Sequence, residues 1–371
     1  MKAIISGGGT GGHIYPALAV AKALKEKGWD ILYIGSKGGL ESDVVPREDI
    51  NYREINVAPL IRKISPKLIT ATFKTSIGLL ESFKIIKSYK ADIVLGTGGF
   101  VAGPVVLAAS LMNIPTIIHE QNVYPGFTNK LLAKRVNFIA LNFEDAKKYF
   151  PKNTKAEYLL TGNPIRSIIL ETERKEGIKK MNLSTEKKTI LVFGGSQGAM
   201  SINNAILDVY KNYLNKNKRS IPQIIHITGK KNYKQVLEKI KSEGININKL
   251  DNYKIMPYLS EMEYAYAVAD LIVSRAGATG LAEITAKGIP AILVPYPHAA
   301  ENHQEHNART LEKNKAAKVL LDSDLNGETL FREIDNLIND DTKLNIMSEN
   351  SKKLGKINAR DMIVEAIEKL M

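Results

Sequence analysis

Short apolar runs rich in β-branched residues alternate with stretches of helical periodicity along the first half of the chain. The runs read KAIIS, ILYIG, DIVLG, PTIIHE, FIAL and EYLLTGN. Strands that alternate with helices pair in parallel, and the helices cover both faces of the sheet. The pattern therefore predicts a doubly wound α/β domain in the first half of the chain.

The same alternation restarts after Pro164, with the runs TILVFGG, QIIHITG, YKIMPY, LIVSRAG, PAILVPYP and AKVLLD. We therefore expect two Rossmann-like α/β domains, covering residues 1–164 and 165–345. The Lys- and Glu-rich stretch 165–188 lacks a clean apolar face and is the natural connection between them. The C-terminal segment of about 346–371 should pack back on the first domain, because its last helix has an apolar face at Met362, Ile363, Ala366, Ile367 and Leu370.

Composition narrows the possible functions. The chain has 371 residues, 44% of them hydrophobic, which is enough for two cores. The absence of cysteine excludes disulfides, thiolate metal sites and a cysteine nucleophile, and it suits a reducing compartment. A formal charge of +13 favours anionic partners. No recognition helix, zinc spacing or basic–aromatic pattern accompanies this charge, so nucleic acid is not expected.

No segment is expected to cross a membrane. The most apolar long window, 100–118, is interrupted by Pro104, Asn113 and Pro115, and it predicts a buried helix followed by a strand. The first strand-like run begins at Lys2, without the pattern of a secretory signal. The cytosol is the expected compartment.

Three glycine-rich loops follow predicted strands: GGGTGGH from Gly7, GTGGFVAGP from Gly96 and FGGSQGA from Phe193. Glycines let backbone amides approach an anion or a sugar at the carboxyl end of a parallel sheet. None of the loops carries the lysine of a P-loop, which argues against an ATPase or kinase. The first loop also satisfies GxGxxG, and Lys37 after the next strand would suit NADP, so an NADP-linked oxidoreductase stays open.

The segment SRAGATGLAEITAKGIPAILVPYP, residues 274–297, has the pattern of a nucleotide site. A strand ends at Arg275, Gly277 permits a turn, and a helix begins near Thr279 with Glu283 in its first two turns. Helix amides can take a pyrophosphate, and the carboxylate can take the ribose hydroxyls. Downstream, His303, Gln304 and Asn307 share one helical turn and can bind sugar hydroxyls.

Other polar motifs are interpreted as structural. DSD at residues 322–324 resembles a metal-binding DxD motif, but its place between a strand and a helix favours turn and N-cap chemistry. His226 lies in a strand and is expected in the core. No metal site is predicted, and no cofactor is required, although a divalent cation is left open as an aid to the diphosphate.

Seven motifs in order make the chain resemble the GT-B family of glycosyltransferases that transfer N-acetylglucosamine from UDP-N-acetylglucosamine to lipid I, forming lipid II in peptidoglycan synthesis. These motifs are GGTGGHIYPALAVA, GTGGFVAGP, HEQNVYPGFTNK, TGNPIR, FGGSQGA, SRAGATGLAEI and HQEHNA. The resemblance spans nearly the whole chain. It implies a GT-B fold with two domains facing a cleft, the donor on the C-terminal domain and the acceptor on the N-terminal loops.

The resemblance also implies roles for individual residues. The donor would be bound by Thr10, Gly11, Gly12, Asn122, Arg166, Gly195, Ser196, Leu259, Ala278, Thr279, Glu283, His303, Gln304 and Asn307. The acceptor-side loops would include Gly98, Gly99 and Asn129. Two positions depart from the family pattern. Gly280 stands where relatives often have Thr or Ser, which removes a hydroxyl, and His303 stands where some have Gln, which could alter a sugar contact.

Inversion at the sugar needs a base that activates the acceptor hydroxyl. His13 and Glu120 are both candidates, because each lies next to an acceptor-side loop. His119 is expected to be a positioned neighbour of Glu120. Another GT-B glycolipid glycosyltransferase, a UDP-sugar epimerase and a nucleotide-binding membrane adaptor are the alternative functions.

The resemblance implies a peripheral location on the cytoplasmic face of the bacterial membrane. Residues 60–90 are the expected docking segment on an anionic membrane surface, because basic and apolar residues are interleaved there and Glu81 is the only acid. The basic residues are Arg62, Lys63, Lys67, Lys74, Lys84, Lys87 and Lys90, and the apolar ones are Ile64, Leu68, Ile69, Phe73, Ile77, Leu80 and Phe83.

Overall fold

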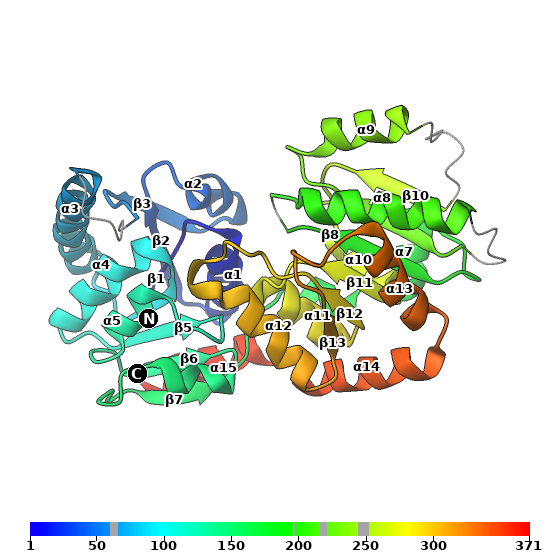
Figure 1. Cartoon of the computed structure of the whole chain (residues 1–371). Helices are drawn as coiled ribbons and strands as arrows, with labels where there is room; N and C mark the ends of the chain where they lie inside the picture. Colours follow the sequence, from blue (N-terminus) through cyan, green and yellow to red (C-terminus); the bar gives the residue numbers. More distant parts are fainter. Residues whose placement is uncertain (60–65, 196, 216–220, 244–251) are drawn as a thin grey trace. The chain divides into compact units, whose positions relative to one another are not determined.

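The predicted strands form two parallel sheets, each in its own compact unit (Figure 1). The structure, a computed structural model, describes residues 1–59, 66–195, 197–215, 221–243 and 252–371. Unit 1 comprises Met1–Ile165 and Lys356–Met371, and unit 2 comprises Arg166–Gly355. Among the described helices, none has the length and apolar character needed to span a bilayer.

The sheet of unit 1 has seven parallel strands in the order β3-β2-β1-β4-β5-β6-β7. Its central strands are buried on both faces, as expected for a parallel sheet covered by helices. The strands are β1 (Lys2–Gly7), β2 (Asp30–Ser36), β3 (Asn51–Ile55), β4 (Ile93–Gly98), β5 (Thr116–Glu120), β6 (Phe138–Leu141) and β7 (Glu157–Leu160). The apolar pattern had not indicated β3, because this edge strand is mostly polar and partly exposed.

Helices cover both faces of this sheet. They are α1 (Gly11–Glu26), α2 (Leu40–Val44), α3 (Pro66–Tyr89), α4 (Gly99–Leu111), α5 (Phe127–Leu132) and α15 (Ala359–Lys369), with the short 3-10 helices η1 (Pro46–Glu48) and η2 (Glu144–Tyr149). The apolar window 100–118 is α4 followed by β5, as predicted.

The sheet of unit 2 has six parallel strands in the order β10-β9-β8-β11-β12-β13. They are β8 (Thr189–Phe193), β9 (Gln223–Ile227), β10 (Tyr253–Met256), β11 (Leu271–Ser274), β12 (Ala291–Leu293) and β13 (Ala317–Val319). The helices are α6 (Ser167–Glu171), α7 (Arg174–Met181), α8 (Met200–Asn215), α9 (Tyr233–Ser242), α10 (Met262–Val268), α11 (Ala278–Lys287), α12 (His303–Lys313), α13 (Gly327–Ile338) and α14 (Asp341–Leu354), with the 3-10 helix η4 (Ala300–Asn302).

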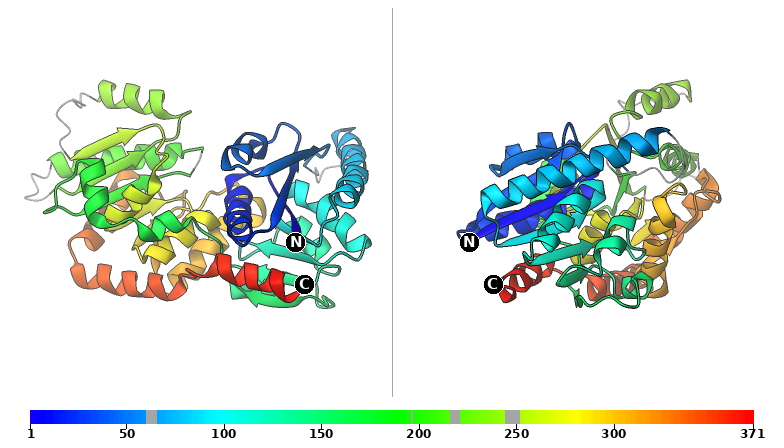
Figure 2. Two further views of the ribbon diagram at one scale, coloured as in Figure 1. Left: turned by 180° about the vertical axis from the view of Figure 1, so that it is seen from behind. Right: turned by 90° about the vertical axis from the view of Figure 1, so that its left-hand side faces the viewer.

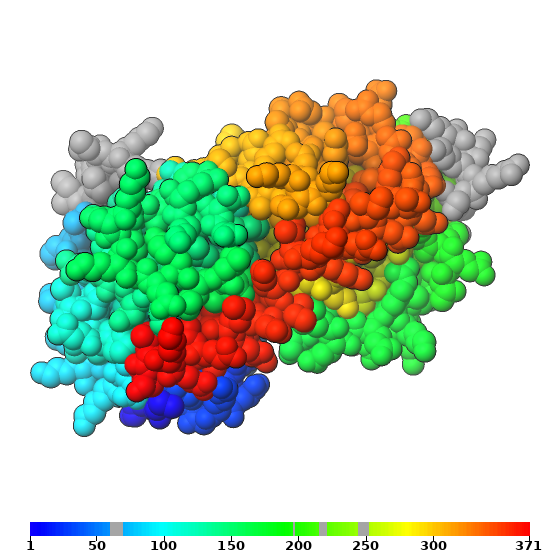
Figure 3. Space-filling model, turned by 90° about the horizontal axis from the view of Figure 1, so that it is seen from below, coloured from blue at the N-terminus to red at the C-terminus, as the bar shows by residue number. Residues whose placement is uncertain are grey.

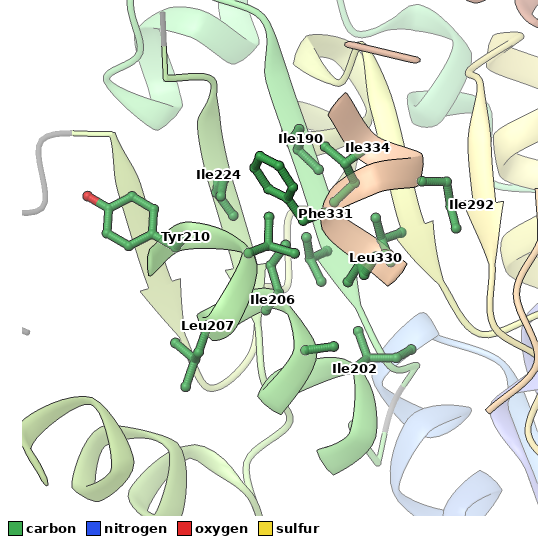
Figure 4. Close-up of a cluster of buried hydrophobic side chains, with 14 of the residues drawn as sticks. Ile190, Ile202, Ile206, Leu207, Tyr210, Ile224, Ile292, Leu330, Phe331 and Ile334 are labelled. Carbon is green, nitrogen blue, oxygen red and sulfur yellow. The ribbon is translucent and has the colours of Figure 1, made fainter. Parts of the chain in front are cut away.

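The core of unit 2 lies between its sheet and the helices α8 and α13. Ile202 and Ile206 of α8 and Phe331 of α13 meet strand residues such as Ile190 and Ile224 in one buried cluster (Figure 4). Leu330 and Ile334 extend this cluster from α13. The spacing of buried residues on α13 is the i, i+3, i+4 pattern of a helix that covers a sheet.

The C-terminal segment is divided between the two units. α14 belongs to unit 2, and the chain joins unit 1 from Lys356 onward, where α15 packs on α1 (Figure 2). Ile363, Val364 and Ile367 join the core of unit 1. Lys369 of α15 lies over the ring of Phe138 of β6. Figure 3 shows the C-terminal segment, in red, along the green surface of unit 1.

The stretch 165–188, expected as a connection, is mostly built into unit 2. It contains α6 and α7, and α7 packs closely on α10. An ideal Cβ on Gly177 would lie 2.6 Å from the carbonyl oxygen of Tyr264, so only glycine permits this approach. Met181 is buried at the end of α7. A single glycine and a few apolar residues therefore form the face of α7 that packs on α10, which the many charged residues of this stretch made hard to predict from sequence.

Candidate active site

The first glycine-rich loop joins β1 to α1 at the carboxyl end of the sheet of unit 1. Thr10 is exposed and precedes α1, and its side chain makes no capping hydrogen bond. Gly11 and Gly12 begin the helix and are half-buried. The first amides of a helix have no partner within it and carry its positive end, so this loop can receive oxygen-rich groups.

Glu41 on α2 holds this loop in place beside the end of β2. Its buried carboxylate accepts hydrogen bonds from the Gly9 amide at 3.1 Å, the Ser36 amide at 2.9 Å and the Ser36 hydroxyl at 2.6 Å. An ideal Cβ on Gly8 would lie 2.3 Å from a Glu41 oxygen, so the carboxylate fills the space beside the loop. Sequence reasoning missed this residue, whose only signal is an acid after paired glycines at a helix start.

His13, in the first turn of α1, faces the ends of β4 and β5. Its Nδ1 atom lies 3.1 Å from the carbonyl oxygen of Thr97 and 3.2 Å from Oε1 of Gln121. Burial lowers the pKa of His13 below its ordinary value, and the hydrogen bonds with Thr97 and Gln121 oppose that shift. A neutral imidazole at neutral pH is the form that can accept a proton.

Glu120, the second candidate base, is buried at the end of β5 and surrounded by donors. One oxygen accepts from the Asn122 amide at 3.0 Å, and the other accepts from the Gly126 amide at 2.9 Å and from Asn129 Nδ2 at 2.8 Å. Burial raises the pKa of Glu120, while these hydrogen bonds act to lower it. The carboxylate thus anchors the loop that follows β5, and Asn129 belongs to this anchor.

Gly98 and Gly99 bring the loop GTGGFVAGP, which follows β4, against the first glycine-rich loop. Gly98 has φ +102°, and an ideal Cβ there would lie 2.8 Å from Nδ1 of His13. Gly99 has φ +80°, and an ideal Cβ there would lie 2.2 Å from the carbonyl oxygen of Gly8. Both positions therefore require glycine for backbone conformation and for space.

In unit 2, β11 leads through Gly277 into α11 as predicted. Gly277 is extended and precedes the helix, whose first residues are Ala278 and Thr279. The Thr279 hydroxyl is buried and has no hydrogen-bond partner among the described residues. A buried hydroxyl beside unpaired helix amides suits a ligand that brings acceptor oxygens. An ideal Cβ on Gly280 comes no closer than 3.9 Å to Phe193, so the smaller residue leaves open space there.

Glu283 lies one turn further along α11 within a cluster of polar side chains. Its carboxylate accepts a hydrogen bond from the Tyr266 hydroxyl at 2.8 Å. Arg166 lies 3.9 Å from Glu283 and 3.6 Å from Glu263. Burial raises the pKa of Glu283, and the charge of Arg166 acts in the opposite direction. Sequence reasoning missed Tyr266 and Glu263, because neither lies in a glycine-rich motif and only the fold of α10 brings them to α11.

The polar cluster on α12 forms as predicted, but part of it supports the backbone. Gln304 Oε1 accepts from the Ala276 amide at 3.2 Å and from the Tyr296 amide at 3.0 Å. Asn307 is buried and donates to the carbonyl oxygen of Ala276 at 3.3 Å. His303 lies beside the carbonyl oxygen of Ala300. The α12 side chains therefore fix the loop between β11 and α11.

Two further predicted donor residues, Gly195 and Leu259, lie on loops of unit 2. Gly195 follows β8, is exposed and has φ +79°, with no atom within 4 Å of an ideal Cβ. Leu259 is half-buried in the loop after β10. Ser196 lies outside the described residues. Gly195 and Leu259 thus follow the carboxyl ends of β8 and β10, two strands of the same sheet separated by β9, and ligands of such folds bind at this edge.

The DSD motif is tied to β11 through an ion pair. Asp322 pairs with Arg275 and accepts a hydrogen bond from Ser201 at 2.7 Å. The DSD triplet was expected to supply the N-cap of the following helix. The N-cap of α13 is instead Asn326. His226 is fully buried in β9, as predicted. Within the described parts of the chain, no group of three or more acidic or histidine side chains is placed to hold a metal ion.

Comparison with known proteins identifies the family. The glycosyltransferase family 28 N-terminal domain matches residues 3–141, and the family 28 C-terminal domain matches residues 189–363. The chain belongs to glycosyltransferase family 28. A relative from Halothermothrix orenii, named UDP-N-acetylglucosamine--N-acetylmuramyl-(pentapeptide) pyrophosphoryl-undecaprenol N-acetylglucosamine transferase, is 54% identical over 99% of this chain and 98% of its own.

Solved structures place this family 28 chain in the GT-B fold class. The crystal structure of MurG from Acinetobacter baumannii matches with a TM-score of 0.78 and 29% identity over 99% of both chains. UDP-GlcNAc 2-epimerase from Neisseria meningitidis matches with a TM-score of 0.68 over the full length of both chains, but at 16% identity. The second likeness concerns the fold alone, so the predicted glycosyltransferase activity is favoured over the epimerase alternative.

Proposed function

We propose that this family 28 enzyme transfers N-acetylglucosamine from UDP-N-acetylglucosamine to N-acetylmuramyl-(pentapeptide) pyrophosphoryl-undecaprenol, the lipid I of the predicted reaction. The observation that carries the proposal is the 54% identity, over nearly the full length of both chains, to a relative with this activity in its name. The nucleotide-type arrangement of α11 in unit 2 supports it. No cofactor is required in this proposal.

Unit 2 would bind the donor. The unpaired amides at the start of α11 and the buried Thr279 hydroxyl suit the diphosphate. Glu283 suits the vicinal hydroxyls of the ribose, because its carboxylate is oriented by Tyr266 and its second oxygen faces Arg166 only at 3.9 Å. Arg166 can move from this weak pairing toward a phosphate, since its side chain is 38% exposed.

His13 is the better candidate for the base. Both oxygens of Glu120 already accept hydrogen bonds, from Asn122 and Gly126 of the loop after β5 and from Asn129 of α5. His13 uses only Nδ1 in hydrogen bonds with the described residues, and its Nε2 atom is left for substrate. In the reaction the acceptor hydroxyl oxygen bonds to the sugar C1 carbon, the bond from C1 to the diphosphate oxygen breaks, UDP leaves with that electron pair, and the hydroxyl proton moves to His13 Nε2.

A peripheral location on the cytoplasmic membrane surface is part of the proposal, because the acceptor is lipid-linked. On α3, Phe73 and Leu80 are 67% and 63% exposed and share one helical stripe with Lys84 and Lys87. The opposite stripe of α3, which includes Ile86, packs into unit 1. An exposed apolar stripe continued by lysines suits shallow insertion beside anionic headgroups.

The proposed docking segment is narrower than the sequence predicted. Phe83 packs against the core of unit 1, so it does not belong to the exposed stripe. Glu81, the acid of the segment, accepts hydrogen bonds from the backbone and side chain of Asn56. Arg62, Lys63 and Ile64 lie outside the described residues.

Product analysis tests the activity. Incubation with UDP-N-acetylglucosamine and lipid I should yield UDP and a lipid product heavier by one N-acetylglucosamine residue in mass spectrometry. Glu283→Ala should lower kcat/KM for the donor by roughly 10- to 150-fold, corresponding to ~1.5–3 kcal/mol, because a charge-assisted pair to two hydroxyls is lost.

Glu261→Ala is the matched control, because Glu261 is an exposed acid of unit 2 paired with Lys180. It should leave the donor constants within about twofold of wild type, as a surface pair contributes little. Epimerisation of the UDP-sugar without lipid I would contradict the proposed function. An unchanged donor kcat/KM in Glu283→Ala would contradict the proposed donor site.

A further inference from the structure

A continuous chain of hydrogen bonds runs through the interior of unit 1 behind His13. It joins His13 on α1, Thr97 at the end of β4, Gln121 directly after β5, His119 within β5, and Gly162 after β7. His119 and Gln121 are buried, with exposed fractions of 0% and 2%. Every group in this chain must therefore be matched donor to acceptor, because water cannot correct a mismatch.

The chain of hydrogen bonds starts at the Gly162 carbonyl group, which can act only as an acceptor. The Gly162 carbonyl oxygen can only accept, and His119 Nε2 lies 2.9 Å from it, so Nε2 of His119 carries the hydrogen. Burial lowers the pKa of His119 to about 4, which keeps the ring neutral at neutral pH. Nδ1 of His119 is therefore a lone-pair acceptor.

The orientation of the Gln121 amide follows from its two neighbours. Its Nε2 atom lies 3.0 Å from Nδ1 of His119 and 2.6 Å from the carbonyl oxygen of Thr97. Both neighbours accept, so both hydrogens of the amide group are used there. The Oε1 atom of Gln121 is left to face His13 at 3.2 Å.

His13 stands at the other end of this chain. Its Nδ1 atom faces two acceptor oxygens, Oε1 of Gln121 and the carbonyl oxygen of Thr97. A lone pair on Nδ1 would face two other lone pairs, so Nδ1 must carry the hydrogen. In the neutral ring the lone pair is then on Nε2. After proton uptake at Nε2 the Nδ1 hydrogen still points at the same two oxygens, so no reorientation is needed.

We propose that Gln121 and His119 are positioning residues that hold His13 as its Nδ1–H tautomer, so that Nε2 is the atom that takes the acceptor's proton. This inference rests on the proposed function, in which His13 is the base. It concerns which atom of His13 reacts and what determines that atom. The carbonyl group of Gly162, a residue far from His13 in the sequence, sets the direction of the hydrogen bonds.

Nitrogen NMR of the full chain with ¹⁵N-labelled histidine tests the tautomer directly. The protein has six histidines, and the signals lost in His13→Gln identify His13. Wild type should show neutral His13 with hydrogen on Nδ1. Gln121→Met removes the oxygen and the amide hydrogens and leaves only the Thr97 carbonyl oxygen opposite Nδ1, so the fraction of neutral His13 with hydrogen on Nδ1 should fall. Gln121→Glu keeps an oxygen opposite Nδ1 and should retain the wild-type fraction.

Kinetics provide the second measurement. Gln121→Met should lower kcat by at least 10-fold and leave KM for the donor within about twofold, and His13→Gln should lower kcat by roughly 100-fold or more. His226→Gln, which removes a buried histidine of unit 2, is the matched control and should alter neither the His13 signals nor kcat by more than about twofold.

The two hypotheses fail in different ways. Normal turnover in His13→Gln would show that His13 is not the base and would overturn the proposal together with that part of the proposed function. A hydrogen on Nε2 of neutral His13 in wild type, or an unchanged tautomer and kcat in Gln121→Met, would overturn the positioning role alone. If Gln121→Met does not fold, the wild-type tautomer and Gln121→Glu still decide the question.

Discussion

At the scale of single residues, histidines with lowered pKa values have different roles in this protein. His226 lies in β9 with its ring nitrogens 2.7 Å from the Tyr253 hydroxyl and 2.9 Å from Asn203 Oδ1. Burial lowers the pKa of His226 to about 3. Unlike His13, it has both nitrogens paired inside the core, so its effect should be on stability and not on turnover.

We expect His226 to make unit 2 sensitive to acid. Its pKa is about 3 in the folded state, against an ordinary value of about 6.5 in an unfolded chain, so below pH 6.5 the unfolded state binds more protons. The stability contribution is therefore present above pH 6.5 and is lost as pH falls toward 3. Between pH 7 and pH 5, the free energy of unfolding of wild type relative to His226→Gln should fall by ~2 kcal/mol.

Urea unfolding followed by circular dichroism at both pH values measures this difference. Comparison with the variant cancels the opposing contributions of Glu120 and Glu283, whose pKa values are raised in the folded state. A difference between wild type and His226→Gln that is the same at pH 7 and pH 5 would contradict the assignment.

At the scale of elements, the junction of β4 and α4 positions His13. Gly98 has φ +102°, and an ideal Cβ there would meet the His13 ring at 2.8 Å. The strand end and the helix α1 can approach each other only because this side chain is absent. The glycine-rich loop is therefore required here by the fit between two elements as well as by a possible ligand.

Gly98→Ala should lower both stability and turnover. The strained backbone should cost about 1–3 kcal/mol of unfolding free energy, and displacement of His13 should lower kcat by at least about 10-fold. Gly28→Ala is the matched control: Gly28 also has positive φ, +80°, but no atom lies within 4 Å of an ideal Cβ. It should show a similar stability loss with normal kcat, and an equal loss of kcat in both variants would refute the steric explanation.

At the scale of the whole molecule, the positions of some basic residues indicate which anionic partner the formal charge of +13 suits. Lys74, Lys84 and Lys87 are exposed on α3, near the exposed Phe73 and Leu80. Charge on its own would suit any polyanion. Combined with an apolar stripe and a lipid-linked acceptor, it favours an anionic membrane surface.

Reversal of Lys74, Lys84 and Lys87 to Glu should weaken binding to phosphatidylglycerol vesicles by about 100-fold at low salt, since each basic residue near such a surface contributes ~1 kcal/mol. Co-sedimentation at low and high salt is the measurement. Reversal of Lys175, Lys179 and Lys234, three exposed lysines of unit 2, changes the net charge equally and serves as the control. Equal vesicle binding by the two triple variants would exclude α3 as the docking face.

The sequence by itself determined the two parallel sheets, the glycine-rich strand ends and the nucleotide-type pattern around Glu283. These features depend on short-range periodicity and on motifs that can be followed along the chain. His13 and Glu120 stood as equal candidates for the base, because sequence proximity to a loop does not say which atoms are already paired. The strand β3 was missed for a different reason, because its mostly polar sequence has no apolar run.

Only the tertiary structure decided how the side chains are used. The strand order places the ends of β1, β4 and β5 side by side, which brings Gln121 to His13 although they are far apart in the chain. The same packing occupies the oxygens of Glu120, binds Asn307 to the Ala276 backbone and places Tyr266 on Glu283. Hydrogen-bond partners inside a fold are set by long-range strand order and burial, and neither is written in the local pattern of residues.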